Sequence, residues 1–349
     1  MSFPVKLLLS VLAGLAVFAA MGWFLDLTAT LAALKSLHLG LLPVILALAL
    51  TNYAFRFAKW HYYLHIVGVK VPVGHSLAIY LSGFMMAVTP GKLGEVVKAY
   101  LLKRMVGAKM RVTAPVVLAE RITDVIALLV LSMAGAATLH YGERALLAAA
   151  GVTVLGVVAL SSRRLALWGI DLCGRLPVLE RSAHKLHEAY DSMSALLAPA
   201  PLALGTLVSI PAWAAEGVAF WAIFEGLRPD GAASVTPPLL GAIFVYSFST
   251  LVGALSMLPG GLGAAEAGLA GLTVTLFAVP RGVAAAATLL VRILTLWFAV
   301  ALGAATFAAF SHTFGMTFSD VDAMKREDST SNEVDQSQRH RDTETQRES

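Results

Sequence analysis

The sequence predicts an all-α polytopic membrane protein, and its composition and apolar runs carry this prediction. The chain of 349 residues is 58% hydrophobic and only 14% charged, and its mean hydropathy is +0.75. A soluble domain carries about 25% charged residues. Apolar runs near the length that spans a bilayer recur along the chain. Because these runs are long and rich in Leu and Ala, they do not match the short alternating strands of a membrane barrel.

About six segments are predicted to be full spans, and two more are interrupted. The predicted spans are 7–25, 41–64, 113–139, 145–161, 202–227 and 283–310. Pro and Gly break the segments 75–102 and 238–279, because Pro removes a helix hydrogen bond and Gly lets the chain reverse. We interpret both as re-entrant helical hairpins buried among other helices. The arms of 238–279 are longer, so two full spans remain an alternative there.

A five-residue motif marks both interruptions. The motif Pro-Gly-Lys-Leu-Gly at residues 90–94 recurs as Pro-Gly-Gly-Leu-Gly at residues 259–263, and Arg121 in the next helix is matched by Arg292. These matches predict two repeats in one transmembrane domain. The predicted domain is 1–310, with repeat 1 at about 41–139 and repeat 2 at about 202–310. Three spans separate the hairpins, which makes the repeats inverted, as in transporters whose site lies where the halves meet.

Charge is divided between the apolar part and the end of the chain. Residues 311–349 hold five Lys/Arg and nine Asp/Glu, so they carry −4 and the rest carries +8. We expect 311–349 to be a disordered polar tail. Basic loops fall on one side if both termini are cytoplasmic, as in a multi-pass protein of the bacterial inner membrane. A basic membrane domain favours anionic lipids as partners, and nothing in it indicates nucleic acid.

The first turn is the leading candidate for a phosphate site. Lys92 lies there between Gly91 and Gly94, and the helix that follows points its free N–H groups at the turn. A Lys that snorkels from a surface loop is the alternative interpretation. Gly260 and Gly261 form the second turn without a Lys, so we expect weaker headgroup contact there.

Ionisable residues at predicted membrane depth form the rest of the candidate site. Glu120, Arg121 and Asp124 fall within about one helical turn, and Arg292 reaches similar depth from the other side. They can be a structural ion-pair cluster, or a site for a headgroup or a coupling proton. We predict headgroup contact for Lys92, Gly91, Gly94, Arg121, Arg292, Gly260 and Gly261, and coupling or ion pairing for Glu95, Glu120, Asp124, Glu216 and Glu266.

Several further polar residues have simpler explanations. Arg56, Lys59 and Tyr63 share a helix face near the predicted cytoplasmic interface, where we expect them to snorkel to lipid phosphates. His61 and His65 have a spacing that can hold a metal, but no acid lies between them. We therefore predict no metal site.

Catalysis has little support in the sequence. Cys173 is the only cysteine, which excludes a disulfide within the chain and a cysteine-based metal cluster. No serine-hydrolase elbow, zinc-protease motif or nucleotide-binding loop is present. We predict no catalytic residue and no cofactor.

Four stretches carry a family resemblance. They are RFAKWHYYL at 56–64, TPGKLGEVVKAYLLKR at 89–104, APVVLAERITDVIALLVL at 114–131 and LPGGLGAAEAGL at 258–269. In this order they resemble the lysylphosphatidylglycerol synthase transmembrane-region family of flippase-like membrane proteins, over roughly residues 5–310. The resemblance implies a lipid flippase region. A 39-residue polar tail stands where the synthase has a soluble transferase domain, so synthase activity is not implied.

The predicted function is movement of an anionic or polyprenyl-linked amphipathic lipid between the leaflets of the inner membrane. Membrane lipids are the expected partners, and lipid-biosynthesis enzymes are further candidates. Two alternatives remain: a membrane-embedded glycosyl or lipid-headgroup transferase, and an accessory subunit of a hopanoid or glycolipid biosynthesis complex. Donor hydrolysis by pure protein would indicate the transferase, and leaflet movement by pure protein would exclude a purely accessory role.

Overall fold

The computed structural model describes residues 27–88, 93–139, 183–227, 236–256 and 258–315, with positions 147, 150, 151, 154 and 155. This part of the chain is helical. Its α-helices are α2 (Leu27–Lys35), α3 (Leu42–Ile66), α4 (Val73–Ser82), α5 (Leu93–Val106), α6 (Met110–Leu139), α9 (Ala183–Leu196), α10 (Pro199–Gly226), α11 (Leu239–Leu255), α12 (Ala264–Phe277), α13 (Arg281–Arg292) and α14 (Phe298–Phe314). Short 3-10 turns are η1 (Leu39–Leu41), η2 (Gly83–Met86) and η5 (Pro259–Gly261), and the π-helix η6 (Ile293–Trp297) joins α13 to α14.

Long apolar helices confirm the polytopic membrane class. Within the described residues, five helical stretches are long and apolar enough to cross a membrane: Leu39–Ile66, Met110–Leu139, Pro199–Gly226, Pro259–Phe277 and Arg281–Phe314. Four of them match predicted full spans, and the fifth contains the second arm of the second interrupted segment. The predicted span 7–25 and nearly all of 145–161 lie outside the described residues. Helix α14 continues to Phe314, past the predicted domain limit of 310.

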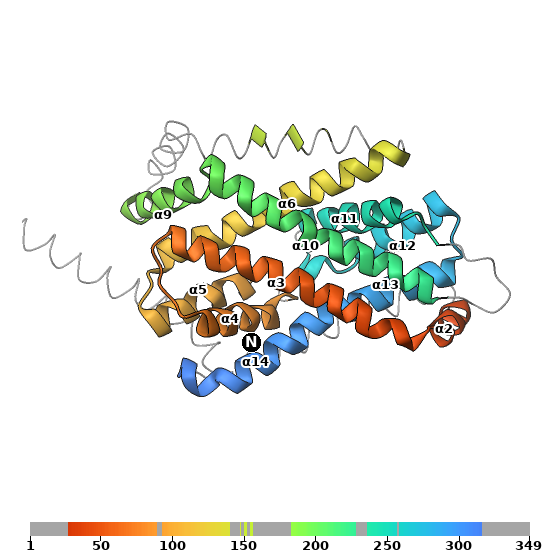
Figure 1. Cartoon of the computed structure of the whole chain (residues 1–349), viewed down its shortest axis with the longest axis horizontal. Helices are drawn as coiled ribbons and strands as arrows, with labels where there is room; N and C mark the ends of the chain where they lie inside the picture. Colours follow the sequence, from red (N-terminus) through yellow and green to blue (C-terminus); the bar gives the residue numbers. More distant parts are fainter. Residues whose placement is uncertain are drawn as a thin grey trace, which may run out of the picture.

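One order of helix lengths occurs twice in the chain. The long helix α3 is followed by the short α4 and α5 and then by the long α6; the long α10 is followed by α11 and α12 and then by the continuous α13–η6–α14. Figure 1 shows α4 and α5 in the half of the molecule that holds α9, and α11 and α12 in the half that holds α2. The helices of the two interrupted segments therefore lie in opposite halves of the molecule, and Val88 at the end of the first described arm packs against Leu262 beside the second turn.

The second interrupted segment turns at its glycines. Gly260, Gly261 and Gly263 have φ angles of 61°, 68° and 87°, a region that residues with a Cβ rarely enter. Helix α12 then has 14 residues, which is about 21 Å of helix against about 30 Å of bilayer core. The corresponding turn of the first segment, with Pro90, Gly91 and Lys92, lies outside the described residues.

Close packing joins the two sets of helices. The long helices α3 and α10 run side by side along the molecule, and α6 contacts both. Small residues allow such approaches, as is common between membrane helices. A Cβ on Gly135 of α6 would collide with Phe244 of α11, and one on Gly205 of α10 would collide with the Tyr63 hydroxyl of α3. Long polar side chains can therefore meet in the centre of the bundle.

Candidate functional site

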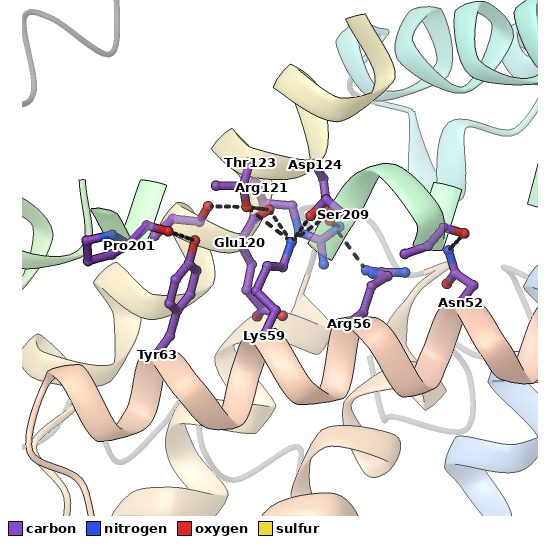
Figure 2. Close-up of polar contacts among 12 residues, drawn as sticks. Asn52, Arg56, Lys59, Tyr63, Glu120, Arg121, Thr123, Asp124, Pro201 and Ser209 are labelled. Atoms are coloured by element: carbon purple, nitrogen blue, oxygen red, sulfur yellow. Dashed lines mark hydrogen bonds and ion pairs between the residues drawn. The ribbon is translucent and has the colours of Figure 1, made fainter. Parts of the chain in front are cut away.

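Helix α3 presents one polar face to the interior. Asn52, Arg56, Lys59 and Tyr63 are spaced by four, three and four residues, which places them on one side of a helix. Figure 2 shows these side chains pointing from α3 toward α6 and α10. Lys59 is only 2% exposed. The interpretation of Arg56, Lys59 and Tyr63 as snorkelling side chains is therefore wrong, because polar partners for them lie inside the bundle.

Lys59 joins three helices. Its Nζ donates hydrogen bonds to Asp124 Oδ1 at 2.7 Å, Ser209 Oγ at 2.6 Å and Thr123 Oγ1 at 3.1 Å, and it lies 3.3 Å from the Glu120 carbonyl oxygen. The Ser209 hydroxyl also donates to Asp124 Oδ1 at 3.0 Å. Such a network stabilises a membrane bundle because a buried charge without partners is costly. Lys59 thus ties α3 to both α6 and α10.

Asp124 is shared by three cations. Its Oδ2 lies 3.7 Å from Arg56 Nη2 and 3.7 Å from Arg121 Nη1, while Oδ1 accepts from Lys59. The Arg56 guanidinium also lies over the Trp213 ring, 5.2 Å from its centre. Because 3.7 Å is too long for a hydrogen bond, neither arginine hydrogen-bonds Asp124, and charge attracts both to it. One carboxylate does not neutralise three cations.

A second ion pair ties α5 to α6. Lys98 Nζ donates to Glu120 Oε2 at 2.8 Å. The same ammonium lies 4.3 Å from the centre of the Trp60 ring and 5.1 Å from that of Tyr80. Aromatic faces attract cations, so the two rings and the Glu120 carboxylate jointly hold the Lys98 ammonium in place.

The second half contains its own ion pair at the turn. Arg292 Nε donates to Glu266 Oε1 at 2.6 Å, and Arg292 Nη2 donates to the Gly260 carbonyl at 2.7 Å. The backbone N–H of Gly263 donates to Glu266 Oε2 at 2.6 Å, which caps α12. Arg292 therefore binds the Pro-Gly-Gly-Leu-Gly turn near its start, at Gly260, and Glu266 binds it at its end, at Gly263.

Glu216 of α10 is a further buried carboxylate. It is 5% exposed, and its carboxylate accepts a hydrogen bond from the Tyr246 hydroxyl of α11. Nearby, the Tyr53 hydroxyl donates to the Thr295 carbonyl at 2.6 Å, inside the π-helix η6. Single π-turns occur often at functional sites.

The structure gathers most of the predicted charged residues into these clusters. Glu120, Arg121 and Asp124 form the first cluster, and Gly260, Glu266 and Arg292 form the second. Gly94 and Glu95 lie in the first turn of α5, whereas Gly91 and Lys92 lie outside the described residues. Gly261 packs its backbone against Gly253.

The predicted site did not include several residues that complete these clusters. They are Arg56, Lys59, Lys98, Ser209 and Tyr246. For α3 a signal was present, because four polar residues at helical spacing within an apolar run indicate a buried polar face. A hydroxyl such as that of Ser209 gives no comparable signal. Within the described residues, no group of three or more His, Cys, Asp or Glu could hold a metal ion.

The fold and the buried charges define a polytopic helical membrane protein with a polar network through its bundle. The family model of the lysylphosphatidylglycerol synthase TM region matches residues 11–303, so the chain belongs to this family and the resemblance of its motifs is confirmed. The UPF0104 membrane protein of Methanothermobacter thermautotrophicus is 25% identical over 234 residues. That match covers 58% of this chain and 63% of the archaeal protein, so the chain spans less than two thirds of this relative's length.

Proposed function

We propose that the protein moves an anionic or polyprenyl-linked amphipathic lipid between the leaflets of the cytoplasmic membrane. The observation that carries the proposal is the convergence of three cations on one buried carboxylate. Lys59 hydrogen-bonds Asp124, and Arg56 and Arg121 lie 3.7 Å from the same carboxylate. Positive charge inside a membrane bundle is costly unless a counter-charge joins it. The phosphate of a lipid headgroup supplies that counter-charge.

Geometry around Asp124 suits exchange with a phosphate. Arg56 and Arg121 approach the carboxylate at 3.7 Å without a hydrogen bond to it, and guanidinium groups bind phosphate oxygens in a bidentate manner. The Arg121 side chain is 34% exposed, so a ligand can reach it. A headgroup that enters here gains charge-assisted hydrogen bonds with Arg56 and Arg121, which Asp124 does not form with them.

An apolar groove on the same two helices suits an acyl chain. It has a volume of about 530 Å³ and is lined by Ile126, Pro199, Leu202, Ala203, Thr206 and Leu207. Ile126 lies two residues after Asp124 on α6, and Leu207 lies two residues before Ser209 on α10. A lipid can therefore keep its tail on the outer, apolar side of α6 and α10 while its headgroup meets the first cluster.

The proposed architecture is a pair of inverted repeats. It rests on the repeated order of helix lengths and on the place of α4–α5 and α11–α12 in opposite halves of the molecule (Figure 1). In this arrangement both interrupted segments are re-entrant and enter from opposite faces, and both termini are cytoplasmic. Transporters built in this way alternate access to a site between the repeats.

Reconstitution tests the proposal. Purified protein in vesicles should move labelled phosphatidylglycerol, and Arg56→Gln should slow this movement about ten- to a hundredfold, because a charge-assisted hydrogen bond contributes about 1.5–3 kcal/mol. Arg104→Gln is the matched control, since Arg104 is an exposed arginine on α5. Thermal unfolding of both variants confirms that they fold.

The other outcomes identify the alternatives. Release or transfer of a headgroup by the pure protein, without leaflet movement, would favour a transferase. Absence of both activities until a lipid-biosynthesis enzyme is added would favour an accessory subunit. Movement by Arg56→Gln at the wild-type rate would contradict the proposed role of the first cluster.

A further inference from the structure

One buried carboxylate differs from the others in its partner. Glu120, Asp124 and Glu266 each accept a hydrogen bond from a Lys or Arg side chain, at 2.8, 2.7 and 2.6 Å. Glu216 instead accepts from the neutral hydroxyl of Tyr246. Among the described residues, no Lys or Arg forms an ion pair with Glu216. A carboxylate at membrane depth without a paired cation marks a place where a proton can bind.

Glu216 is placed to affect the first cluster. It lies on α10 seven residues after Ser209, which is two turns and about 10.5 Å along the same helix face. Arg56 occupies the space between them, because its guanidinium contacts Asp124 on one side and lies over Trp213, one turn before Glu216, on the other. Arg56 therefore lies beside Asp124 and within electrostatic reach of Glu216.

The charged and titratable groups around Glu216 come from every helix packed against it. Helix α11 supplies Tyr246, α3 supplies Arg56 and Tyr53, α6 supplies Asp124, and α13 supplies Arg292. Arg292 is already hydrogen-bonded to Glu266 and to the Gly260 carbonyl. Lys59 already occupies Oδ1 of Asp124. The cation whose charge balance depends most on Glu216 is thus Arg56.

We propose that Glu216 binds a proton and that this proton controls how strongly Arg56 holds an anionic headgroup. The inference rests on the proposed lipid transport. When Glu216 is ionised, its charge offsets part of the positive charge of Arg56; when a proton neutralises it, Arg56 attracts a phosphate more strongly. The Tyr246 hydroxyl can donate to one carboxyl oxygen of Glu216 in both states, so this hydrogen bond does not depend on the proton.

Linkage makes the effect reciprocal. If a proton on Glu216 strengthens headgroup binding, a bound headgroup strengthens proton binding by the same factor. Proton and anionic lipid then occupy the site together and cross in the same direction. Coupling of this kind uses a proton gradient and needs no nucleotide.

The first test compares lipid affinity at mildly acidic and alkaline pH. For the full-length protein in detergent, binding of a short-chain phosphatidylglycerol should tighten about tenfold at acidic pH, which lies within the usual range of coupling between two sites. Glu216→Gln should bind with the acidic-pH affinity at both pH values. Glu225→Gln, nine residues further along α10, should keep the wild-type pH dependence. A Glu216→Gln protein with that dependence intact would overturn the proposal.

A second readout separates this proposal from the transport function. Infrared difference spectra on acidification should contain the C=O stretch of a protonated carboxylic acid, and Glu216→Gln should remove it. Tyr246→Phe should shift the pH at which the band forms without removing it, because the phenol positions Glu216 but does not hold the proton. If no lipid binds at any pH, the transport function fails while this band still supports the proton site. A band that Glu216→Gln leaves unchanged overturns the proton site in either case.

Discussion

Lys98 and Glu266 lie at similar places in the two halves of the protein, eight residues after Pro90 and seven after Pro259, and carry opposite charges. Each lies on the short helix that follows a Pro-Gly motif, and each pairs with the next long helix, Lys98 with Glu120 of α6 and Glu266 with Arg292 of α13. The polarity of the pair is therefore reversed between the halves.

The Lys98–Glu120 pair is predicted to stabilise the fold. Lys98→Met removes the charge that compensates Glu120, which is 1% exposed. Loss of one partner of a buried ion pair costs about 3–5 kcal/mol in soluble proteins. The double variant Lys98→Met/Glu120→Gln should regain most of this loss.

Thermal unfolding in detergent measures these variants. Lys103→Met is the matched control, because Lys103 is an exposed lysine on the same helix. If Lys98→Met unfolds at the wild-type temperature, water or lipid compensates Glu120 and the pair does not stabilise α5.

Ser209 is predicted to hold the first cluster in place. Its hydroxyl accepts from Lys59 at 2.6 Å and donates to Asp124 at 3.0 Å. Ser209→Ala should therefore lower the free energy of unfolding by about 1–3 kcal/mol, because two buried groups lose a partner. The control is Ser194→Ala, whose hydroxyl donates to the Asp191 carbonyl of its own helix. If denaturant titrations gave the same free energy of unfolding for both variants, the contact between Lys59 and Asp124 would not depend on this hydroxyl.

Substitution by Ala should have different effects on stability at Gly261 of the second turn and at Gly271 of α12. Gly261 has a φ of 68°, and a Cβ there would lie 3.1 Å from the Gly253 Cα. Gly261→Ala should destabilise the protein by about 1–2 kcal/mol from backbone conformation alone. A Cβ on Gly271 of α12 would meet nothing within 4 Å, so Gly271→Ala should be neutral or stabilising. Similar melting temperatures for the two variants would contradict the strained turn.

The sequence predicted the long helices because the length of an apolar run corresponds directly to the length of the helix that it forms. The predicted 113–139 is α6 (Met110–Leu139), and the predicted 202–227 is α10 (Pro199–Gly226). Glu266 and Arg292 were also predicted as site residues, since charges within apolar runs need a partner. Their joint contact with the turn follows from the capping position of Glu266, three residues after Gly263.

Pairing between distant helices was not predictable from these patterns. Lys59 lies 65 residues from Asp124 and 150 from Ser209, and no local period specifies which helices pack together. Tyr63 and Lys59 were assigned to the interface because long amphipathic side chains often reach it. The close approach of α10 at Gly205 encloses Tyr63 instead, and that approach is a property of the packed bundle.

The last prediction concerns the direction of the two interrupted segments. Lys109 lies in the connection between α5 and α6, and Arg281 begins α13 after α12; both are exposed. In inverted repeats with re-entrant segments these connections lie on opposite faces of the membrane. Because Cys173 is the only cysteine, Lys109→Cys and Arg281→Cys can each be introduced into a Cys173→Ser protein. In sealed vesicles of one orientation, an impermeant maleimide should label one variant, and after permeabilisation it should label both. Labelling of both variants from the same side before permeabilisation would exclude the inverted arrangement, while the ion pairs of each half would still stand.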